Sequence, residues 1–333
     1  MRWRFSKFSI RTALYAINVF LLLFISSCKK EEDGNINYRQ KMRDFVTRLS
    51  SYAKIQKTSF LIIPQNGQEL ITYNGESDGM LIWNYVHSID ATGREDLFFG
   101  YTGDDIETPA DDQTHMLDLC SLCERLGIEV LTTDYCSTDS KIDSSCSWNH
   151  REGFISFSAP ERNLNVIPTY PARPYNENSS SIESIHSAYN FLYLINSENF
   201  ETKADFIKAV SASWYDVIIM DLFHSGEAYT TEEIGQLKNK PNGNQRLVVC
   251  YLSIGEAEDY RYYWQSDWNT SKPEWLEAEN PDWKGNYTVQ YWDTAWQQLI
   301  YGNADSYLDR IIHAGFDGAY LDLIDAFEYF ESE

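Results

Sequence analysis

The sequence is poor in basic residues. Its 27 lysines and arginines stand against 50 aspartates and glutamates, so the formal net charge is −23 at pH 7. Proteins that bind nucleic acid need clustered lysine and arginine to contact the phosphates, and this balance argues against a nucleic-acid partner. The excess of acid is typical of the solvated surface of a secreted protein, and it also permits a cationic ligand.

The chain also lacks an apolar run of the ~20 residues that a membrane-spanning helix needs. Its N-terminus has a basic segment at residues 2–11 and a short apolar run at residues 13–25, followed by two serines and Cys28. This order is typical of a bacterial lipoprotein signal. We expect a signal peptide over residues 1–27, a lipid on Cys28 and a flexible tether over residues 28–37; the alternative is an uncleaved anchor helix. The lipid would hold the protein at the membrane of the cell envelope, facing the periplasm or the exterior.

Motifs for metals and cofactors are missing as well. With Cys28 modified, five cysteines remain, and an odd number excludes complete internal pairing. Cys120 and Cys123 have zinc-like spacing, but they lie in an amphipathic helical pattern without a second Cys or His pair, so we interpret them as buried thiols. Cys136 and Cys146 flank one loop and are the candidates for a disulfide. No glycine-rich nucleotide fingerprint follows any apolar run, and we expect neither a metal nor a cofactor.

Short apolar runs recur along the chain and predict β-strands. The eight candidate strands are residues 59–64, 97–101, 128–133, 153–158, 191–195, 217–222, 247–254 and 318–323. Several of these runs lack period-two alternation, as expected of parallel strands that are covered on both faces. Helical spacing separates most of them. The pattern predicts one α/β domain, residues 38–333, folded as a (β/α)8 barrel; a doubly wound sheet is the alternative.

The segments between the strands differ in character. Helices are predicted over residues 38–52, 80–89, 111–126, 204–213, 232–237 and 295–314, and a polar loop is predicted before residue 153. Residues 169–184 are rich in Pro, Asn and Ser and form a predicted connector. Residues 260–296 form an insert dense in Tyr and Trp. Its rings suit stacking on sugars, but they could equally pack on one another.

Acidic and amide side chains follow many of the candidate strands. In a parallel barrel the C-terminal ends of the strands converge on one site. Carboxylates at the end of an apolar run are costly unless they face a solvated functional cavity. The side chains expected to converge are Asn66, Glu95, Asp134, Asp221, Glu256 and Asp322.

Several long motifs resemble one family, the TIM-barrel glycoside hydrolases of family 114, which includes endo-α-1,4-polygalactosaminidases. The matching stretches are YLSIGEAEDYRYYW, NPDWKGNYTVQYWD, GFDGAYLDLIDAFEYF, FLIIPQNGQEL, GREDLFFGYTGDD and VLTTDYC. The resemblance implies a hydrolase acting on a galactosamine-containing polysaccharide. In the family the last three of these stretches follow the first three along the chain, whereas in this sequence they precede them. A circular permutation explains this, with the former termini joined through residues 169–184.

The resemblance also implies a catalytic pair, Asp322 as nucleophile or electrostatic stabiliser and Glu95 as general acid/base. Glu256 is a rival for the second role, and Glu258 is expected to pair with Arg261 or with a neighbouring helix. The side chains expected to bind substrate are Asp221, Asn66, Gln65, Asp134, Tyr135, Tyr251, Asp325, Arg162 and Trp264. The competing interpretation is a lipoprotein that binds glycans without cleaving them.

Overall fold

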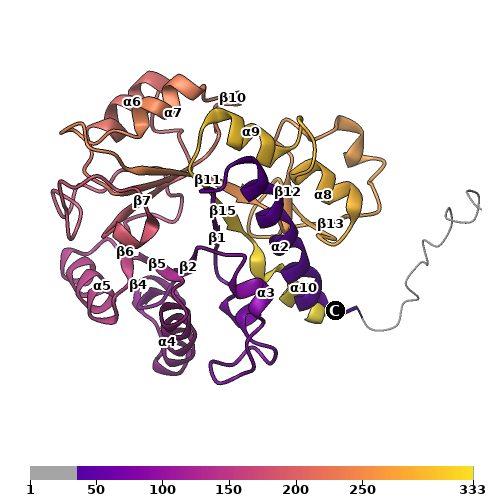
Figure 1. Ribbon diagram of the computed structural model, residues 1–333, viewed down its shortest axis with the longest axis horizontal. Helices are drawn as coiled ribbons and strands as arrows, with labels where there is room; N and C mark the ends of the chain where they lie inside the picture. The colour runs from indigo at the N-terminus through magenta and orange to yellow at the C-terminus, as the bar shows by residue number, and fades with distance from the viewer. Residues whose placement is uncertain (1–35, 333) are drawn as a thin grey trace, which may run out of the picture. The chain divides into compact units, whose positions relative to one another are not determined.

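The computed structural model describes residues 36–332, in which short strands lie at the centre and helices lie around them (Figure 1). The predicted signal peptide, Cys28 and most of the tether lie outside the described residues. Within the described part, none of the helices is both long and apolar enough to cross a membrane.

Two parallel sheets form the centre. Their strands are β1 (Leu61–Pro64), β2 (Ala91–Glu95), β5 (Glu129–Tyr135), β6 (Ile155–Ala159), β7 (Phe191–Leu194), β8 (Val217–Met220), β11 (Leu247–Ser253) and β15 (Gly318–Asp322). One sheet has the order β1-β15-β11-β8-β7 and the other the order β2-β5-β6. Single parallel bridges link the two sheets, from Gln65 to Gly93 and from Ser156 to Asn190. The fold is therefore mixed α/β with parallel sheets.

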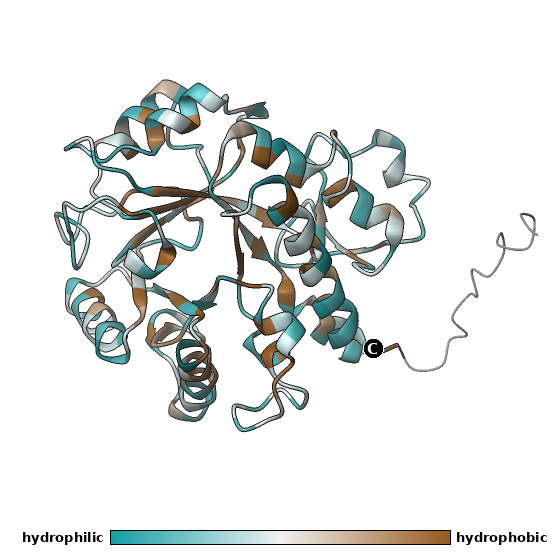
Figure 2. Cartoon of the chain, viewed as in Figure 1, coloured by the Kyte–Doolittle hydropathy of each residue, from teal (hydrophilic) through white to brown (hydrophobic). Residues whose placement is uncertain are grey.

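The helices cover the outside of these strands. They are α2 (Tyr38–Gln56), α3 (Trp83–Val86), α4 (Ala110–Arg125), α5 (Asp139–Glu152), α6 (Lys203–Ser211), α7 (Thr231–Leu237), α8 (Thr294–Ile300), α9 (Tyr307–Ala314) and α10 (Phe327–Ser332). The residues of β8 and β11 are buried throughout, as expected of parallel strands covered on both faces. Figure 2 shows much of the central strands in hydrophobic colouring. Residues 295–314 contain two helices rather than one, and only Trp83–Val86 of the predicted helix 80–89 is helical.

Smaller sheets lie in the loops after the central strands. Their strands are β3 (Phe99–Gly100), β4 (Gly103–Glu107), β9 (Phe223–His224), β10 (Glu227–Ala228), β12 (Glu256–Glu258), β13 (Leu276–Glu279) and β14 (Asn286–Val289). The aromatic insert, residues 260–296, contributes β13 and β14, which form an antiparallel sheet with β12. The connector, residues 169–184, contains neither helix nor strand, in agreement with the prediction.

Residues 97–101 were predicted as a strand of the parallel sheet, but only residues 99–100 form a strand, and it lies outside that sheet. The strand of the parallel sheet is β2, and residues 99–100 pair only with β4 in a hairpin that follows it. The sequence of β2, ATGRE, has no apolar run. A Cβ on Gly93 would lie 1.9 Å from the hydroxyl oxygen of Tyr320, so this interior position has no room for a bulky side chain. The other predicted strands overlap β1, β5, β6, β7, β8, β11 and β15.

Helix α5 was predicted as a polar loop. Its buried face includes Ser145 and Asn149, whose side chains both donate hydrogen bonds to Asp134 Oδ2, at 2.6 and 2.9 Å. The helix thus packs through polar contacts as well as apolar ones. Because polar residues occupy part of its buried face, the sequence of α5 shows only a weak apolar repeat of 3.6 residues, and hydrophobic periodicity therefore does not predict this helix.

The two ends of the described chain lie together. The rings of Tyr38 in α2 and Phe330 in α10 stack with their centroids 5.4 Å apart. Arg39 Nε forms an ion pair with Glu331 Oε1 at 3.1 Å. The first and last helices are therefore direct neighbours.

Candidate active site

Glu95 is the last residue of β2, and a tyrosine of the next strand holds its carboxyl. The hydroxyl of Tyr135, in β5, donates a short hydrogen bond to Glu95 Oε1. The backbone N–H of Glu95 donates to Asn66 Oδ1 at 3.2 Å. Burial raises the pKa of Glu95 to about 7 and the charge of Asp322 adds to the rise, whereas the Tyr135 hydrogen bond lowers the pKa. Glu95 can therefore hold a proton near neutral pH, as a general acid must.

Asp322 is the last residue of β15, and its carboxylate is held in a similar way. The hydroxyl of Tyr251, in the adjoining strand β11, donates to Asp322 Oδ2 at 2.6 Å. The backbone N–H of Leu323 donates to Oδ1 at 2.8 Å. Burial raises the pKa of Asp322, and these two hydrogen bonds lower it. Each carboxyl of the predicted catalytic pair thus receives a hydroxyl from a tyrosine on a neighbouring strand.

Strand β1 lies between the strands that carry the two carboxyls. Gln65 follows β1 directly, and the hydroxyl of Tyr193, in β7, donates to Gln65 Oε1 at 2.8 Å. A hydrogen bond with Gln65 also lowers the pKa of Glu95. The structure therefore brings Gln65, Glu95 and Asp322 together, along with the tyrosines that bind them.

Asp325 is a third carboxyl beside the pair. It lies in the short 3-10 helix η4 (Ile324–Ala326) and is half-buried. No other residue among 36–332 donates a hydrogen bond to its carboxyl. Burial, then the charges of Asp322 and Glu328, raise the pKa of Asp325 to about 7, and Arg94 lowers it. Its oxygens are therefore available to a ligand.

Asp134 was predicted to bind substrate, and the structure corrects this. Its side chain has no exposed surface. Its oxygens accept hydrogen bonds from the backbone N–H groups of Phe98 and Phe99 and from the side chains of Ser145 and Asn149. Asp134 therefore joins α5 to the loop after β2 and cannot reach a ligand.

Arg162 contacts protein groups rather than an open site. Its Nε donates to Asp104 Oδ1 at 2.6 Å and its Nη2 donates to Asp96 Oδ1 at 2.9 Å. The guanidinium carbon lies 4.0 Å from the centre of the Tyr135 ring. Arg162 therefore supports the tyrosine that binds Glu95, and the prediction that it binds substrate is not favoured by this geometry.

Asp221 is likewise engaged. Its Oδ2 forms an ion pair with Arg261 Nη1 at 2.6 Å, and its Oδ1 accepts from the N–H of Phe223 at 2.7 Å. Arg261 also donates from Nε to Glu258 Oε2 at 2.6 Å, so the predicted pairing of Glu258 with Arg261 is confirmed. Both oxygens of Asp221 have protein partners, which leaves little hydrogen-bonding capacity for a sugar hydroxyl.

Glu256 is less suited to proton transfer than Glu95. Its side chain is buried, and its oxygens accept hydrogen bonds from Asn280 Nδ2 at 2.8 Å and Asn286 Nδ2 at 3.2 Å. Burial raises the pKa of Glu256, whereas these two hydrogen bonds lower it and the charge of Asp322 adds to the rise. The two amides tie β12 to the aromatic insert.

Most rings of the aromatic insert pack on one another. Trp264, predicted to bind substrate, packs against Trp268 and Tyr287, with centroids 5.1 and 4.9 Å apart. Tyr260 was not singled out from the sequence, yet it is 62% exposed and its hydroxyl is bound to Glu258. Its place directly after the acids of GEAED was the sequence signal that could have pointed to it.

The five cysteines within residues 36–332 form no disulfide. Cys136 and Cys146, the candidates for a disulfide, are buried free thiols in this structure, and the Sγ of Cys146 lies 3.6 Å from Ser158 Oγ. Cys120 and Cys123 are buried free thiols as well. In the described part of the chain, no three His, Cys, Asp or Glu side chains could jointly hold a metal ion.

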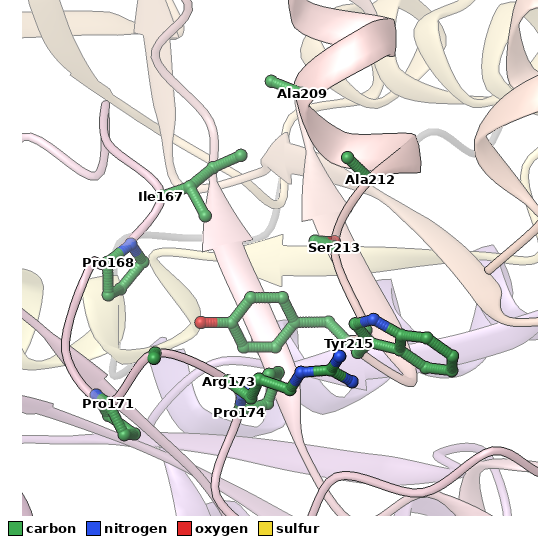
Figure 3. Close-up of a pocket in the computed structure, with 11 residues that line it drawn as sticks. Ile167, Pro168, Pro171, Arg173, Pro174, Ala209, Ala212, Ser213 and Tyr215 are labelled. Carbon is green, nitrogen blue, oxygen red and sulfur yellow. The ribbon is translucent and has the colours of Figure 1, made fainter. Parts of the chain in front are cut away.

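A cavity of about 330 Å³ lies elsewhere, beside the segment that leads into β8 (Figure 3). Its walls are prolines of the connector, alanines of the α6 end, Arg173, Trp214 and Tyr215. This is the N-terminal side of β8, whereas the carboxyls follow the C-terminal ends of β2 and β15. None of the predicted site residues lines it.

Comparison with known proteins gives matches that each cover part of the chain. An uncharacterized protein of Methanocaldococcus jannaschii is 40% identical over 156 residues, which is 46% of this chain and 41% of the relative. Uncharacterized proteins of Thermotoga maritima and Deinococcus radiodurans are each 42% identical, over 127 and 123 residues, and each match covers 37% of both chains. The chain thus matches well under half the length of these relatives. The model of the glycoside-hydrolase family GH114 matches residues 178–333, so this part of the chain is similar to that family.

Proposed function

We propose that the protein is a glycoside hydrolase that cleaves a polysaccharide with Glu95 as general acid/base and Asp322 as nucleophile or electrostatic stabiliser. The observation that carries this proposal is the pair of carboxyls at the ends of β2 and β15, each fixed by a tyrosine hydroxyl. Hydrolysis of a glycosidic bond needs one carboxyl that is protonated and one that is ionised. A pKa of about 7 suits Glu95 to the first role.

For the substrate we propose a polymer that contains α-1,4-linked galactosamine. Asp325 supports this, because a half-buried carboxyl that receives a hydrogen bond only from its own backbone can accept further hydrogen bonds from an ammonium group. The net charge of −23 would also attract a cationic chain. Carboxyls bind sugar hydroxyls too, so a neutral polysaccharide is the alternative substrate.

The test is incubation with partly deacetylated poly-α-1,4-galactosamine, with oligosaccharide products read by mass spectrometry. A fully acetylated polymer serves as the neutral comparison. We expect products from the cationic polymer. Binding of the polymer without any product would support the non-catalytic alternative, and neither products nor binding would overturn the proposed substrate.

We further infer that the two parallel sheets are parts of one closed eight-stranded barrel. The bridges Gln65–Gly93 and Ser156–Asn190 support this, because each joins an edge strand of one sheet to an edge strand of the other. The hydrogen bond from Tyr193 in β7 to Gln65 after β1 supports it further, because it connects the two edges of the five-stranded sheet. With these links, the strands follow one another around the barrel in chain order.

A circular permutation is the proposed origin of the segment order. The family match begins at residue 178, inside the connector, and runs to residue 333. This supports a junction of former termini at residues 169–184. The adjacency of α2 and α10 is consistent with new termini opened at a former loop.

For location we propose a lipoprotein of the bacterial cell envelope, anchored through Cys28. The support is the sequence alone: a basic segment, a short apolar run and small residues before Cys28. Cys28→Ala is expected to move the protein from the membrane fraction to the soluble fraction, because the residue that would carry the lipid is gone. The readout is fractionation followed by blotting. A variant that stays in the membrane fraction would indicate an uncleaved anchor helix.

Tyr135→Phe is expected to move the alkaline limb of the pH profile to higher pH. As general acid Glu95 must be protonated, so activity should fall as pH rises through its pKa of about 7. The Tyr135 hydroxyl stabilises the carboxylate form, and its loss therefore raises the pKa of Glu95. The measurement is kcat/KM against pH. Tyr170→Phe, whose hydroxyl bonds Asp143 at 3.0 Å, is the control and should leave the limb in place; a limb that moves to lower pH would contradict the assignment.

A further inference from the structure

Leu323, which follows Asp322 directly, has an unusual backbone conformation. Its φ is 60°, in the left-handed helical region. This region is unfavourable for leucine, because the Cβ crowds the neighbouring backbone. Strain of this kind persists only where the surroundings enforce it, and it is often found at functional sites.

The surroundings of Leu323 include two glycines, one after each strand that flanks β15. A Cβ on Gly255, after β11, would lie 2.4 Å from the carbonyl oxygen of Leu323 and 2.8 Å from the Cβ of Ala326. A Cβ on Gly67, after β1, would lie 2.6 Å from Cγ2 of Ile324. Ile324 is fully buried. The turn formed by Leu323 and η4 therefore lies between Gly255 and Gly67, two positions that have no room for a side chain.

The consequence of the turn is the direction of the chain after Asp322. An extended Leu323 would continue the line of β15 away from the strand ends. The left-handed residue instead leads at once into η4, where the N–H of Ala326 donates to the carbonyl of Leu323. This keeps Asp325 near Asp322, and the charge of Asp322 is the main neighbouring charge acting on the Asp325 carboxyl.

We propose that Leu323, Gly255 and Gly67 are positioning residues that hold the Asp325 carboxyl against Asp322, where it contacts the substrate. The contact with substrate rests on the proposed function, whereas the position of Asp325 does not. Leu323 and the two glycines act through Asp325 and do not themselves touch the reacting sugar.

The first test needs no substrate and follows the Asp325 carboxyl by ¹³C NMR in aspartate-labelled protein, with Asp325→Asn used to assign its signal. The charged groups acting on this carboxyl are Asp322, Glu328 and Arg94. We expect the signal to titrate near pH 7 in the wild type and at lower pH in Asp322→Asn. In Gly255→Ala, the added Cβ should displace the turn, and the signal should titrate at lower pH as well.

The control for this substitution is Gly235→Ala, because a Cβ at Gly235 meets no atom within 4 Å. It should leave the Asp325 titration unchanged. If Gly255→Ala behaves like this control, the inference is overturned. Should Gly255→Ala fail to fold, Gly67→Ala tests the opposite side of the turn, where the left-handed φ of 61° at Gly67 adds backbone strain to the close contact with Ile324.

The second test is a double-mutant cycle on kcat/KM. Gly255→Ala should lower kcat/KM about tenfold, mainly through KM, in the wild-type background, and should have little further effect in Asp325→Asn. Losses that multiply would mean that Gly255 does not act through Asp325. If the wild type cleaves nothing while the NMR result holds, the proposed hydrolase fails and the positioning of Asp325 stands.

Discussion

Asp322→Asn is expected to lower kcat by at least about 10³-fold, and Glu95→Gln by about 10²–10⁴-fold, with little change in stability. Each change removes a charge or a transferable proton and keeps the shape of the side chain. The neighbouring tyrosine hydroxyls, on Tyr251 and Tyr135, can donate to the amide oxygen or accept from the amide nitrogen, so the local packing should survive. The measurement is the rate of oligosaccharide release, with folding checked by thermal melting.

The matched control is Asp317, which lies directly before the first residue of β15. Asp317 forms ion pairs with Lys57 at 3.1 Å and Lys238 at 2.7 Å, and it accepts from the N–H of Val248 at 3.1 Å. Asp317→Asn should lower stability and leave kcat of the folded enzyme unchanged. If Asp322→Asn kept wild-type activity, the proposed mechanism would be refuted. If Glu95→Gln alone remained active, Glu256 would be the next acid to replace.

Lys240→Met is expected to have the largest effect on stability, about 3–5 kcal/mol, because it leaves Asp216 as an unpaired buried charge. Both side chains of this ion pair have no exposed surface. Asp216 also accepts from Asn178 Nδ2 at 2.6 Å and from the N–H of Tyr189 at 2.8 Å. Urea unfolding followed by circular dichroism gives the free energy of unfolding.

Two further variants serve as a rescue and a control for this prediction. Lys240→Met combined with Asp216→Asn should recover part of the loss, because neither partner then carries a buried charge. Arg173→Gln, which breaks the exposed ion pair with Glu177, should change the free energy of unfolding by less than about 1 kcal/mol. If Lys240→Met also lowered the free energy of unfolding by less than about 1 kcal/mol, the buried pair would not be what anchors the connector, which it contacts at Asn178 and Ser180.

The parallel α/β fold could be predicted because most of its strands are apolar on both faces. β11 and β8 are continuous runs of this kind, and their signal is local in the sequence. β2 and α5 carried no such signal, because Gly93 makes room for Tyr320 and α5 packs partly through Ser145 and Asn149. Both contacts join segments that are distant along the chain, so the local sequence does not reveal them.

The residues of the candidate site also differ in how far the sequence alone predicts their roles. Asp322 and Glu95 could be assigned because each belongs to a recognisable motif at a strand end. The roles of Asp134 and Asp221 could not, because a carboxylate in a sequence looks the same whether its partner is solvent or a buried donor. Asp134 is bound by groups of α5 and Asp221 by Arg261, and both contacts depend on tertiary packing.

The contact between α2 and α10 means that the polypeptide could be closed into a ring and cut elsewhere. A short Gly/Ser linker from residue 332 to residue 38 would join ends that already pack through Tyr38, Phe330 and the Arg39–Glu331 pair. A new opening within residues 169–184 would fall where no helix or strand is interrupted. Such a chain would begin with the half that matches GH114, and it should keep the same eight central strands with two different ends.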